Sequence, residues 1–282
     1  MKSKYFTIFL LVLFFTRTIE AAFEDLSTSG RFLGMGSAFV AVAEGSESLL
    51  TNPAGLSQTN NASLSLFYSR PFGIQELTHE TITSVLPTKV GNWGFGFQGF
   101  GNSLYCESTI AIGWSHHVQQ RFYFGVSFRS ARLRIERYGS DNTFIFDTGC
   151  ILKLTDQCQW GASISNLFQS RIGKSEEPLP QIMRTGIGYE PFQGILLSVE
   201  IDKDVRYPFE IRAGAEIRPL SPLALRFGFG REPDFFSAGF GLIWKYCIFD
   251  YAFTTHPILG ATHQGSVSFY IKSLRKKSFR IP

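Results

Sequence analysis

The chain has 282 residues, a formal net charge of +4 and a mean hydropathy of +0.03. Its basic residues do not gather into the footprint of a nucleic-acid-binding domain, so no nucleic-acid partner is expected. Beyond its first residues the sequence has no long apolar run, which excludes a helical membrane protein. The 27 Gly, 29 Phe and 10 Tyr residues are instead typical of β-strands that alternate bulky and minimal side chains.

The two ends of the chain differ from the rest. Lys2 and Lys4 precede an apolar stretch over residues 5–15, and a small-residue site ends at Ala21, which predicts a secretory signal peptide over residues 1–21 with cleavage after Ala21. The stretch is about 11 residues long, well short of the roughly 20 that a spanning helix needs. At the other end, residues 273–282 form a basic tail, interpreted as a solvated end or as a segment attracted to anionic lipid headgroups.

Between these ends the sequence alternates with a period of two. Over residues 209–218 apolar side chains hold the odd positions, while Glu, Arg and Gly hold most of the even ones. Such alternation gives each strand one apolar face and one polar or minimal face. We expect about 14 strands of this kind, at residues 62–70, 79–87, 91–101, 104–116, 120–136, 142–155, 158–168, 182–190, 194–202, 207–218, 222–230, 234–245, 247–255 and 263–272.

These strands predict an all-β fold, a transmembrane antiparallel β-barrel over residues 58–272 with its apolar side chains toward lipid. Connections after even-numbered strands are tight and several after odd-numbered ones are longer, 169–181 among them. An outer-membrane barrel shows this asymmetry, and an even strand count puts both termini with the short turns in the periplasm. In the strand at 120–136 the alternation changes phase, which predicts either a bulge near Arg129 or an extension beyond the membrane.

Residues 22–57 lack the alternation of the strands, and we expect them to form a short helical or irregular plug inside the lumen. A barrel this wide is not filled by its own side chains, which leaves room for such a plug. Gly34-Met35-Gly36 is interpreted as a tight turn, since it lacks the preceding strand and the third Gly of a dinucleotide fingerprint. Asn52-Pro53-Ala54-Gly55-Leu56 supplies the fixed and permissive dihedrals that a turn into the first strand needs, and we expect Asn52 to hydrogen-bond the nearby backbone. The plug motif is therefore Gly34, Met35, Gly36, Asn52, Pro53, Ala54, Gly55 and Leu56.

Charged residues on the polar faces of the late strands form the second candidate site. Close cross-strand neighbours of opposite charge attract one another. The set is interpreted either as an ion-pair lattice that braces the wall and anchors the plug, or as a selectivity lining for a polar solute. Its members are Glu200, Asp202, Glu210, Arg212, Glu216, Arg226, Lys245 and Asp250.

No catalytic motif stands out along the chain. The sequence contains no GxSxG, HExxH or phosphate-cradling loop, so we expect neither an enzyme nor a cofactor. His256 and His263 flank one loop, but a pair of exposed histidines explains them better than a metal site, and no metal is expected. The four cysteines have no framework spacing, so no structural disulfide is predicted.

The N-terminal motifs carry a family resemblance. Residues 30–43, with Gly30-Arg31-Phe32-Leu33-Gly34-Met35-Gly36, and the later Asn52-Pro53-Ala54-Gly55-Leu56 resemble the signature of the PorV/PorQ family, whose barrels share the architecture of the FadL transporters. Residues 225–228, 238–242, 250–253 and 259–263 resemble the closing strands of that family. Ser37, where the family usually has Gly, and residues 44–48 depart from its pattern. The resemblance implies a 14-stranded barrel that serves type IX secretion, while more distant FadL relatives pass hydrophobic molecules through a plugged lumen.

Two functions follow as hypotheses for an exported protein in outer-membrane lipid. The first is a component of protein secretion or surface assembly, whose partners would be secreted cargo or surface attachment proteins held by loops such as 169–181. The alternative is a FadL-like transporter of a hydrophobic small molecule. The inside-out orientation predicts that Phe227→Arg destabilises the barrel, whereas Gly228→Ser on the lumen face should cost little.

Overall fold

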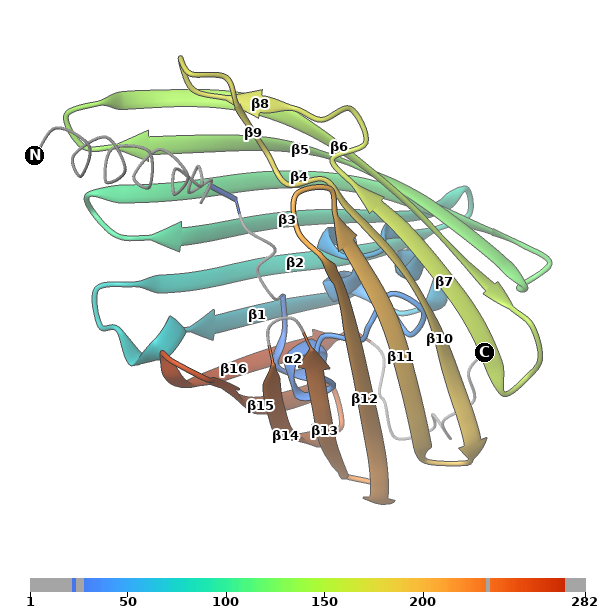
Figure 1. Cartoon of the computed structure of the whole chain (residues 1–282). Coiled ribbons are helices and arrows are strands. Elements are labelled where there is room, and N and C mark those ends of the chain that lie inside the picture. The colour runs from blue at the N-terminus through green and yellow to red at the C-terminus, as the bar shows by residue number, and fades with distance from the viewer. Residues whose placement is uncertain (1–21, 24–27, 232–233, 272–282) are drawn as a thin grey trace, which may run out of the picture.

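The computed structural model describes residues 22–23, 28–231 and 234–271, so the expected signal peptide and the basic tail lie outside the described residues. Within this part of the chain, 14 antiparallel strands close into one barrel, because the first strand pairs with the last along Ser63↔Tyr270 to Ser69↔Gln264. Figure 1 shows the strands wound round a lumen that contains short helical turns. The predicted fold class and strand number are confirmed.

The described helical elements are α2 (Gly30–Gly34) and the 3-10 turns η1 (Ser46–Leu50), η2 (Pro53–Gln58) and η3 (Pro71–Gly73). The barrel strands are β1 (Ser63–Ser69), β2 (Thr78–Thr88), β3 (Gly91–Gly101), β4 (Tyr105–Val118), β5 (Phe122–Ile135), β6 (Gly139–Lys153), β7 (Cys158–Ser165), β10 (Ile182–Phe192), β11 (Ile195–Asp204), β12 (Phe209–Leu220), β13 (Leu223–Arg231), β14 (Phe235–Trp244), β15 (Cys247–His256) and β16 (Gly260–Tyr270). Each pairs with the next along the chain, and β7 pairs with β10.

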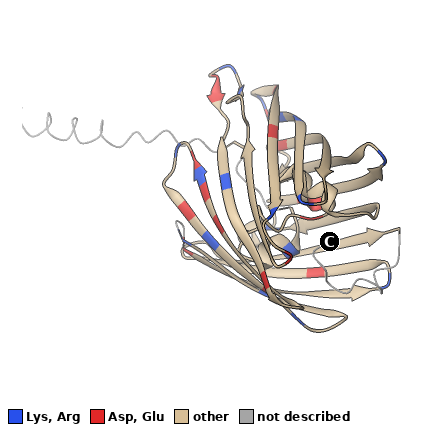
Figure 2. Ribbon diagram, turned by 90° about the vertical axis from the view of Figure 1, so that its right-hand side faces the viewer, with Lys and Arg blue, Asp and Glu red and all other residues tan. Residues whose placement is uncertain are grey.

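The outside of the barrel is apolar. Phe227 and Phe229 on β13 expose about half of their side chains outward, at 47% and 54%, while Arg226, which precedes them on the same strand, is buried toward the lumen. Charged residues are sparse along the strands, as Figure 2 shows. A barrel with apolar side chains outside and polar ones inside fits a lipid bilayer rather than water. Among the described residues, no helix has the length and apolar character needed to cross a membrane.

Strand β5 corrects one expectation. It pairs without interruption from Phe122 to Ile135 with both neighbours, so the bulge predicted near Arg129 is wrong. The alternation changes in the sequence because the inner face turns apolar, with Ala131 buried in the lumen, while Arg132 points outward and is exposed. This arrangement agrees with the other alternative, a strand that extends beyond the apolar band.

The connection between β7 and β10 is not an open loop. It contains a two-stranded sheet of β8 (Arg171–Ile172) and β9 (Glu177–Pro178), visible at the top of Figure 1. Ile172 and Leu179 are buried against Ala131 and Ile145 on the inner face of the barrel. This connection is thus a short folded hairpin whose apolar side chains pack back onto the wall, and its use by a protein partner stays a prediction.

The two ends of the barrel are distinguished by their connections. We call the end that carries η3 and the β8–β9 sheet the loop end, and the opposite end, where β1 begins and β16 finishes, the short-turn end. The Phe23 backbone amide donates to Glu107, which lies near the loop-end start of β4, at 3.0 Å. Phe23 therefore lies at the opposite end of the barrel from Tyr270. The placement of both termini in the periplasm stays a prediction, because the two ends of the chain lie outside the described residues.

The orientation makes a prediction about charge on the outer face. Phe227→Arg places a cation in the middle of the apolar band, where it should lower the free energy of unfolding by roughly 2 to 4 kcal/mol. Tyr246→Arg, in the exposed turn after β14, is the matched control and should cost about 0 to 1 kcal/mol, because the cost falls toward the interface. Denaturant titration of protein folded into lipid vesicles measures both, and equal costs at the two positions would contradict the inside-out assignment.

Candidate functional site

Residues 28–59, which we call the inner segment, lie inside the barrel. All of them are buried except Arg31, Glu44 and Leu50, which are half-buried. The segment begins with α2, whose N-cap Ser29 accepts a hydrogen bond from the Phe32 amide at 3.1 Å, and ends with η2, where Asn52 caps the Ala54 amide at 3.2 Å. Both caps satisfy amides that a short helix leaves without partners.

The inner segment follows the wall round the lumen. Gly30 lies against Asp250 of β15, Met35 against Gly214 of β12, and Ala41 against Gly161 of β7. Further along, Asn52 contacts β6, Pro53 contacts β5 and Leu56 contacts β3. The segment is therefore wrapped along the inner wall strand by strand, and its other end joins β1 a few residues after Gln58.

Inward-facing glycines make this close approach possible. A Cβ at any of the following positions would overlap backbone or side-chain atoms of the inner segment: Gly125, Gly149, Gly161, Gly214 and Gly228. Gly125 lies directly opposite Gly149, and Gly214 directly opposite Gly228, so these residues sit side by side on paired strands. We call the five residues the glycine belt. It lets backbone pack on backbone, which is a use of glycine in strand interiors.

The glycine belt overturns the expectation for Gly228. A Cβ there would overlap the Gly36 backbone, and Gly36 itself has a positive φ of 63° and packs against β13. Serine at position 228 would therefore displace the inner segment rather than cost little. The sequence pattern identified the face correctly, but it did not show that the lumen beside this face is already filled.

The first half of the plug motif is held by wall side chains. Met35 is fully buried, and the Gly36 amide donates to Ser237 Oγ on β14 at 3.0 Å. The same hydroxyl donates to the Gly34 carbonyl at 3.4 Å. The serine thus bonds the Gly34 carbonyl and gives the Gly36 amide a second acceptor beside the Leu33 carbonyl, to which that amide donates at 3.0 Å.

The second half of the motif is bound in the same way. Asn52 Nδ2 donates to the Val40 carbonyl at 2.7 Å and to the Cys150 carbonyl of β6 at 3.3 Å, so Asn52 bonds nearby backbone as the sequence predicts. Asn92 of β3 donates to the Leu56 carbonyl at 2.6 Å. The Ala54 carbonyl accepts from Ser115 of β4, and Pro53 occupies the start of η2, where proline's missing amide costs nothing.

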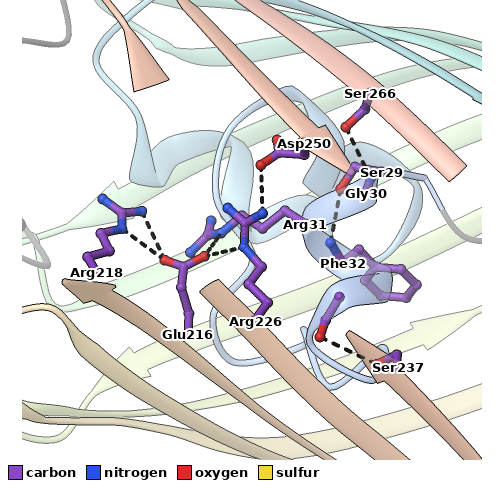
Figure 3. A network of polar contacts seen from close by, with 11 residues as sticks. Ser29, Gly30, Arg31, Phe32, Glu216, Arg218, Arg226, Ser237, Asp250 and Ser266 are labelled. Carbon is purple, nitrogen blue, oxygen red and sulfur yellow. Dashed lines mark hydrogen bonds and ion pairs between the residues drawn. The ribbon is translucent and has the colours of Figure 1, made fainter. Parts of the chain in front are cut away.

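Glu216 of β12 is the centre of a buried ion-pair network, shown in Figure 3. Its Oε2 accepts from Arg226 Nε at 2.7 Å and from Arg31 Nε of the inner segment at 3.0 Å, while Arg218 binds Oε1 at 2.9 Å. Arg226 also pairs with Asp250 of β15 at 2.6 Å. The network therefore ties α2 to three strands of the wall.

A second network surrounds Glu200 of β11. Its Oε2 accepts hydrogen bonds from the Phe39 and Val40 amides, both at 2.6 Å, so this carboxylate holds the inner segment by its backbone. Arg184 of β10 lies 3.9 Å from Glu200 Oε1 and 3.6 Å from Asp202. Arg212 of β12 binds Asp202 at 3.0 Å and Glu210 at 2.7 Å.

Seven of the eight charged residues proposed from the sequence thus belong to the two networks, and Lys245 does not. It lies in the exposed turn after β14 with a positive φ of 44°. Strand β14 ends at Trp244, so its alternation of inward and outward side chains does not extend to Lys245. Arg31, Arg184 and Arg218 were missed, although Arg184 and Arg218 are on even positions of their strands, as are their partners Asp202 and Glu216.

Glu47 in η1 is a buried carboxyl that belongs to the inner segment itself. Ser268 Oγ of β16 donates to its Oε1 at 3.2 Å. Burial, reinforced by the charge of Asp250, raises the pKa of Glu47 to about 7. Because the folded state holds this proton more tightly than the unfolded state, the contribution of Glu47 to stability falls as pH rises from its ordinary range toward about 7.

The described residues contain no cluster of three or more His, Cys, Asp or Glu side chains that could hold a metal ion. The apolar residues of the inner segment pack into the main buried cluster of the barrel, where the rings of Phe32 and Phe39 meet edge to face at 5.5 Å. The inner segment is thus held in the barrel by apolar packing, backbone capping and ion pairs. Its chemistry is suited to holding a segment inside a lumen.

Solved structures share this arrangement of strands. The toluene transporter TodX of Pseudomonas putida superposes with a TM-score of 0.64 at 12% identity, over 87% of this chain and 98% of TodX. The fold is that of the FadL-type outer-membrane barrels. The monoaromatic hydrocarbon channel CymD gives a TM-score of 0.64 at 13% identity, over 90% of this chain and 99% of CymD. A FadL homologue from Pseudomonas aeruginosa gives 0.57 at 12% identity, over 89% of this chain and 98% of the homologue.

No protein-family model matches the sequence, and no curated protein matches it significantly. The structural neighbours are transporters and channels rather than enzymes. They support the FadL-type part of the resemblance and give no separate support to the PorV/PorQ part.

The glycine belt predicts the effect of one added methyl group. Gly228→Ala should lower the free energy of unfolding by about 1 to 3 kcal/mol, the usual cost of overpacking, because its Cβ overlaps the Gly36 backbone. Gly265→Ala on β16 is the control, since its nearest neighbour would lie 3.9 Å away. Limited proteolysis should also cut the inner segment faster in Gly228→Ala. Equal stability and equal cleavage in the two variants would show that the segment is not packed on the belt.

The buried network predicts a large effect of one charge. Glu216→Gln leaves Arg31 and Arg226 without their shared carboxylate and should lower the free energy of unfolding by about 3 to 5 kcal/mol. Glu210→Gln is the control: its carboxylate is 24% exposed, so the loss should be about 0 to 1 kcal/mol. Urea unfolding in vesicles compares the two, and a cost below that of the control would refute the anchoring role of Glu216.

Proposed function

We propose that this protein is an outer-membrane transporter that lets hydrophobic small molecules cross through a barrel closed by its inner segment. The observation that carries the proposal is the inner segment itself, which is wrapped along the inner wall and fixed there at many points. A lumen filled in this way does not suit an open porin, because a general diffusion channel needs a free aqueous path. The proteins that share the fold include a toluene transporter and a monoaromatic hydrocarbon channel.

The outer surface supports the location. Large apolar side chains are exposed on every barrel strand except β7, and such a surface is stable in lipid. We place the short-turn end in the periplasm and the loop end outside the cell, since outer-membrane barrels have short periplasmic turns. The expected signal peptide supplies the route of export.

The buried charges give the inner segment two kinds of attachment. Near Arg31, Phe39 and Val40 it is held by carboxylates of β11 and β12, and near Asn52 and Leu56 by neutral hydrogen bonds. We interpret the charged set as the ion-pair lattice rather than as a selectivity lining, since its members bind one another and the segment. A charged lining would not favour the binding of a hydrophobic solute. The buried ion pairs between the inner segment and the wall can instead be either formed or broken, which gives the segment two discrete states.

The transport function predicts a loss of uptake on deletion. Cells without this protein should take up labelled toluene or a labelled long-chain fatty acid more slowly, and the intact protein should restore the rate. Gly265→Ala is the matched control that should restore it fully, because the nearest atom to the added methyl group would lie 3.9 Å away, an ordinary contact distance. If deletion changes the uptake of neither toluene nor the fatty acid, the proposal is wrong.

The closed state can be tested separately in planar bilayers. Removal of residues 23–43 should leave a folded barrel with a steady larger conductance, because the strand ladder closes without the inner segment. Replacement of residues 52–56 by a flexible linker should instead give flickering currents. A folded deletion variant that conducts no better than the parent would show that the segment does not close the lumen.

A role in protein secretion or surface assembly is the second proposal. It is supported by the resemblance of residues 30–43 and 52–56 to the PorV/PorQ signature, and its partners would be secreted cargo or a surface attachment protein. The β7–β10 connection offers a partner a smaller surface than an open loop would, because Ile172 and Leu179 are buried against the wall. Cross-linking in intact outer membranes followed by purification should recover such a partner if this proposal holds, and recovery of none in a host with type IX components would count against it.

A further inference from the structure

Glu107 on β4 is a buried acid outside the two charge networks. Its side chain faces the lumen near the loop end and the residue is only 4% exposed. The Tyr105 hydroxyl donates to its Oε1, and so does the Phe23 backbone amide, at 3.0 Å. A buried carboxylate is stable when donors or a cation compensate its charge. The wall therefore offers an anion to the first described residues of the chain.

Phe23 is also held by its side chain. It packs against the apolar cluster of Ala131, Ile145, Ile172 and Leu179, which β5, β6 and the β7–β10 connection form at the loop end. Backbone and side chain are thus fixed together next to Glu107. Successive backbone nitrogens lie about 3 to 4 Å apart, so the nitrogen of Ala22 lies no more than about 7 Å from the Glu107 oxygen that accepts from the Phe23 amide.

The expected cleavage after Ala21 would make Ala22, next to Phe23, the first residue of the mature chain. Hydrolysis of the Ala21–Ala22 peptide bond by a leader peptidase adds one water, leaves a carboxylate on Ala21 and turns the neutral amide nitrogen of Ala22 into an α-ammonium. We propose that Glu107 is the docking site for this new N-terminus, so that removal of the leader supplies the cation that fixes the start of the chain at the loop end. The inference rests on cleavage after Ala21 and does not depend on what the barrel transports.

The neighbours of Glu107 define the electrostatics of the pair. Its inward neighbours are Tyr105 and Thr109 on β4, and its direct partners across the ladder are Phe100 on β3 and Leu133 on β5. Of these, Tyr105 carries a titratable phenol, and His79 of β2 lies one strand further along the wall, opposite Phe100. An opposite charge at this distance raises the pKa of an ammonium by about 1 to 3, whereas burial alone lowers it. The two effects have opposite signs, and this makes the proposal testable.

The experiment uses the mature protein purified from outer membranes. Intact-mass and N-terminal sequencing should first find Ala22 at the start, and any other start overturns the proposal. Acetylation of the α-amine by an active ester is then followed from pH 6 to 10 by mass spectrometry of the N-terminal peptide. Its midpoint should lie at least one unit above the ordinary value of about 7.7 to 8.0, so labelling at neutral pH is about tenfold slower than for a free peptide.

Three variants separate the ion pair from simple burial. Glu107→Gln keeps an oxygen for the Phe23 amide but removes the charge, and it should return the midpoint to the ordinary range or below. Glu136→Gln, at an exposed acid near the same end, should leave the raised midpoint unchanged. Two residues, Gly-Ser, inserted before Ala22 move the ammonium away while Glu107 stays intact, which keeps the test valid if Glu107→Gln does not fold. A midpoint in the intact protein that is ordinary or lowered would overturn the proposal.

Discussion

The structure depends on the absence of side chains along one ring of the inner wall. Where the inner segment passes β5, β6, β7, β12 and β13, the wall residue is glycine, and a Cβ there would occupy the space of the segment's backbone. Hydrogen-bonded strands fix the position of the wall, so the space cannot be made by moving the strands apart. The lumen can therefore be filled by a chain that carries small residues itself, such as Gly36 and Ala41.

The charged networks follow from this close approach. A segment pressed against the wall loses water on both sides, and its unpaired amides and its arginine need acceptors inside the barrel. Glu200 supplies one for the amides of Phe39 and Val40, and Glu216 supplies one for Arg31. The carboxylates are in turn compensated by arginines on neighbouring strands, with Glu216 directly opposite Arg226 across the ladder. The wall carboxylates and the polar groups of the inner segment thus compensate one another inside the barrel.

The fold could be read from the sequence to a large extent because strand alternation is local. The faces of residues 209–218 and 222–230, the closure into 14 strands and the membership of Glu200, Asp202, Glu216 and Arg226 in charge networks all follow from a period of two. The contacts between the inner segment and the wall could not be read, since Arg31 and Glu216 are far apart in sequence. The same limit explains the error at Gly228, where the alternation gave the face but not its occupant, and the error at β5, where a change of environment imitated a change of register.

The two halves of the inner segment are held by forces of different kinds. The half near Asn52 and Leu56 is tied by neutral hydrogen bonds and joins β1 through a short connection, so it cannot move far without unravelling that strand. The half from Gly30 to Val40 is held by the ion pair of Arg31 and the amide bonds to Glu200, together with neutral hydrogen bonds to Ser237 and Ser266. In the transporter proposed above, a path through the barrel can open only where the segment leaves the wall. We expect the main cost of that step to lie in uncovering Glu216 and Glu200, because a buried charge is costly to leave without its partners.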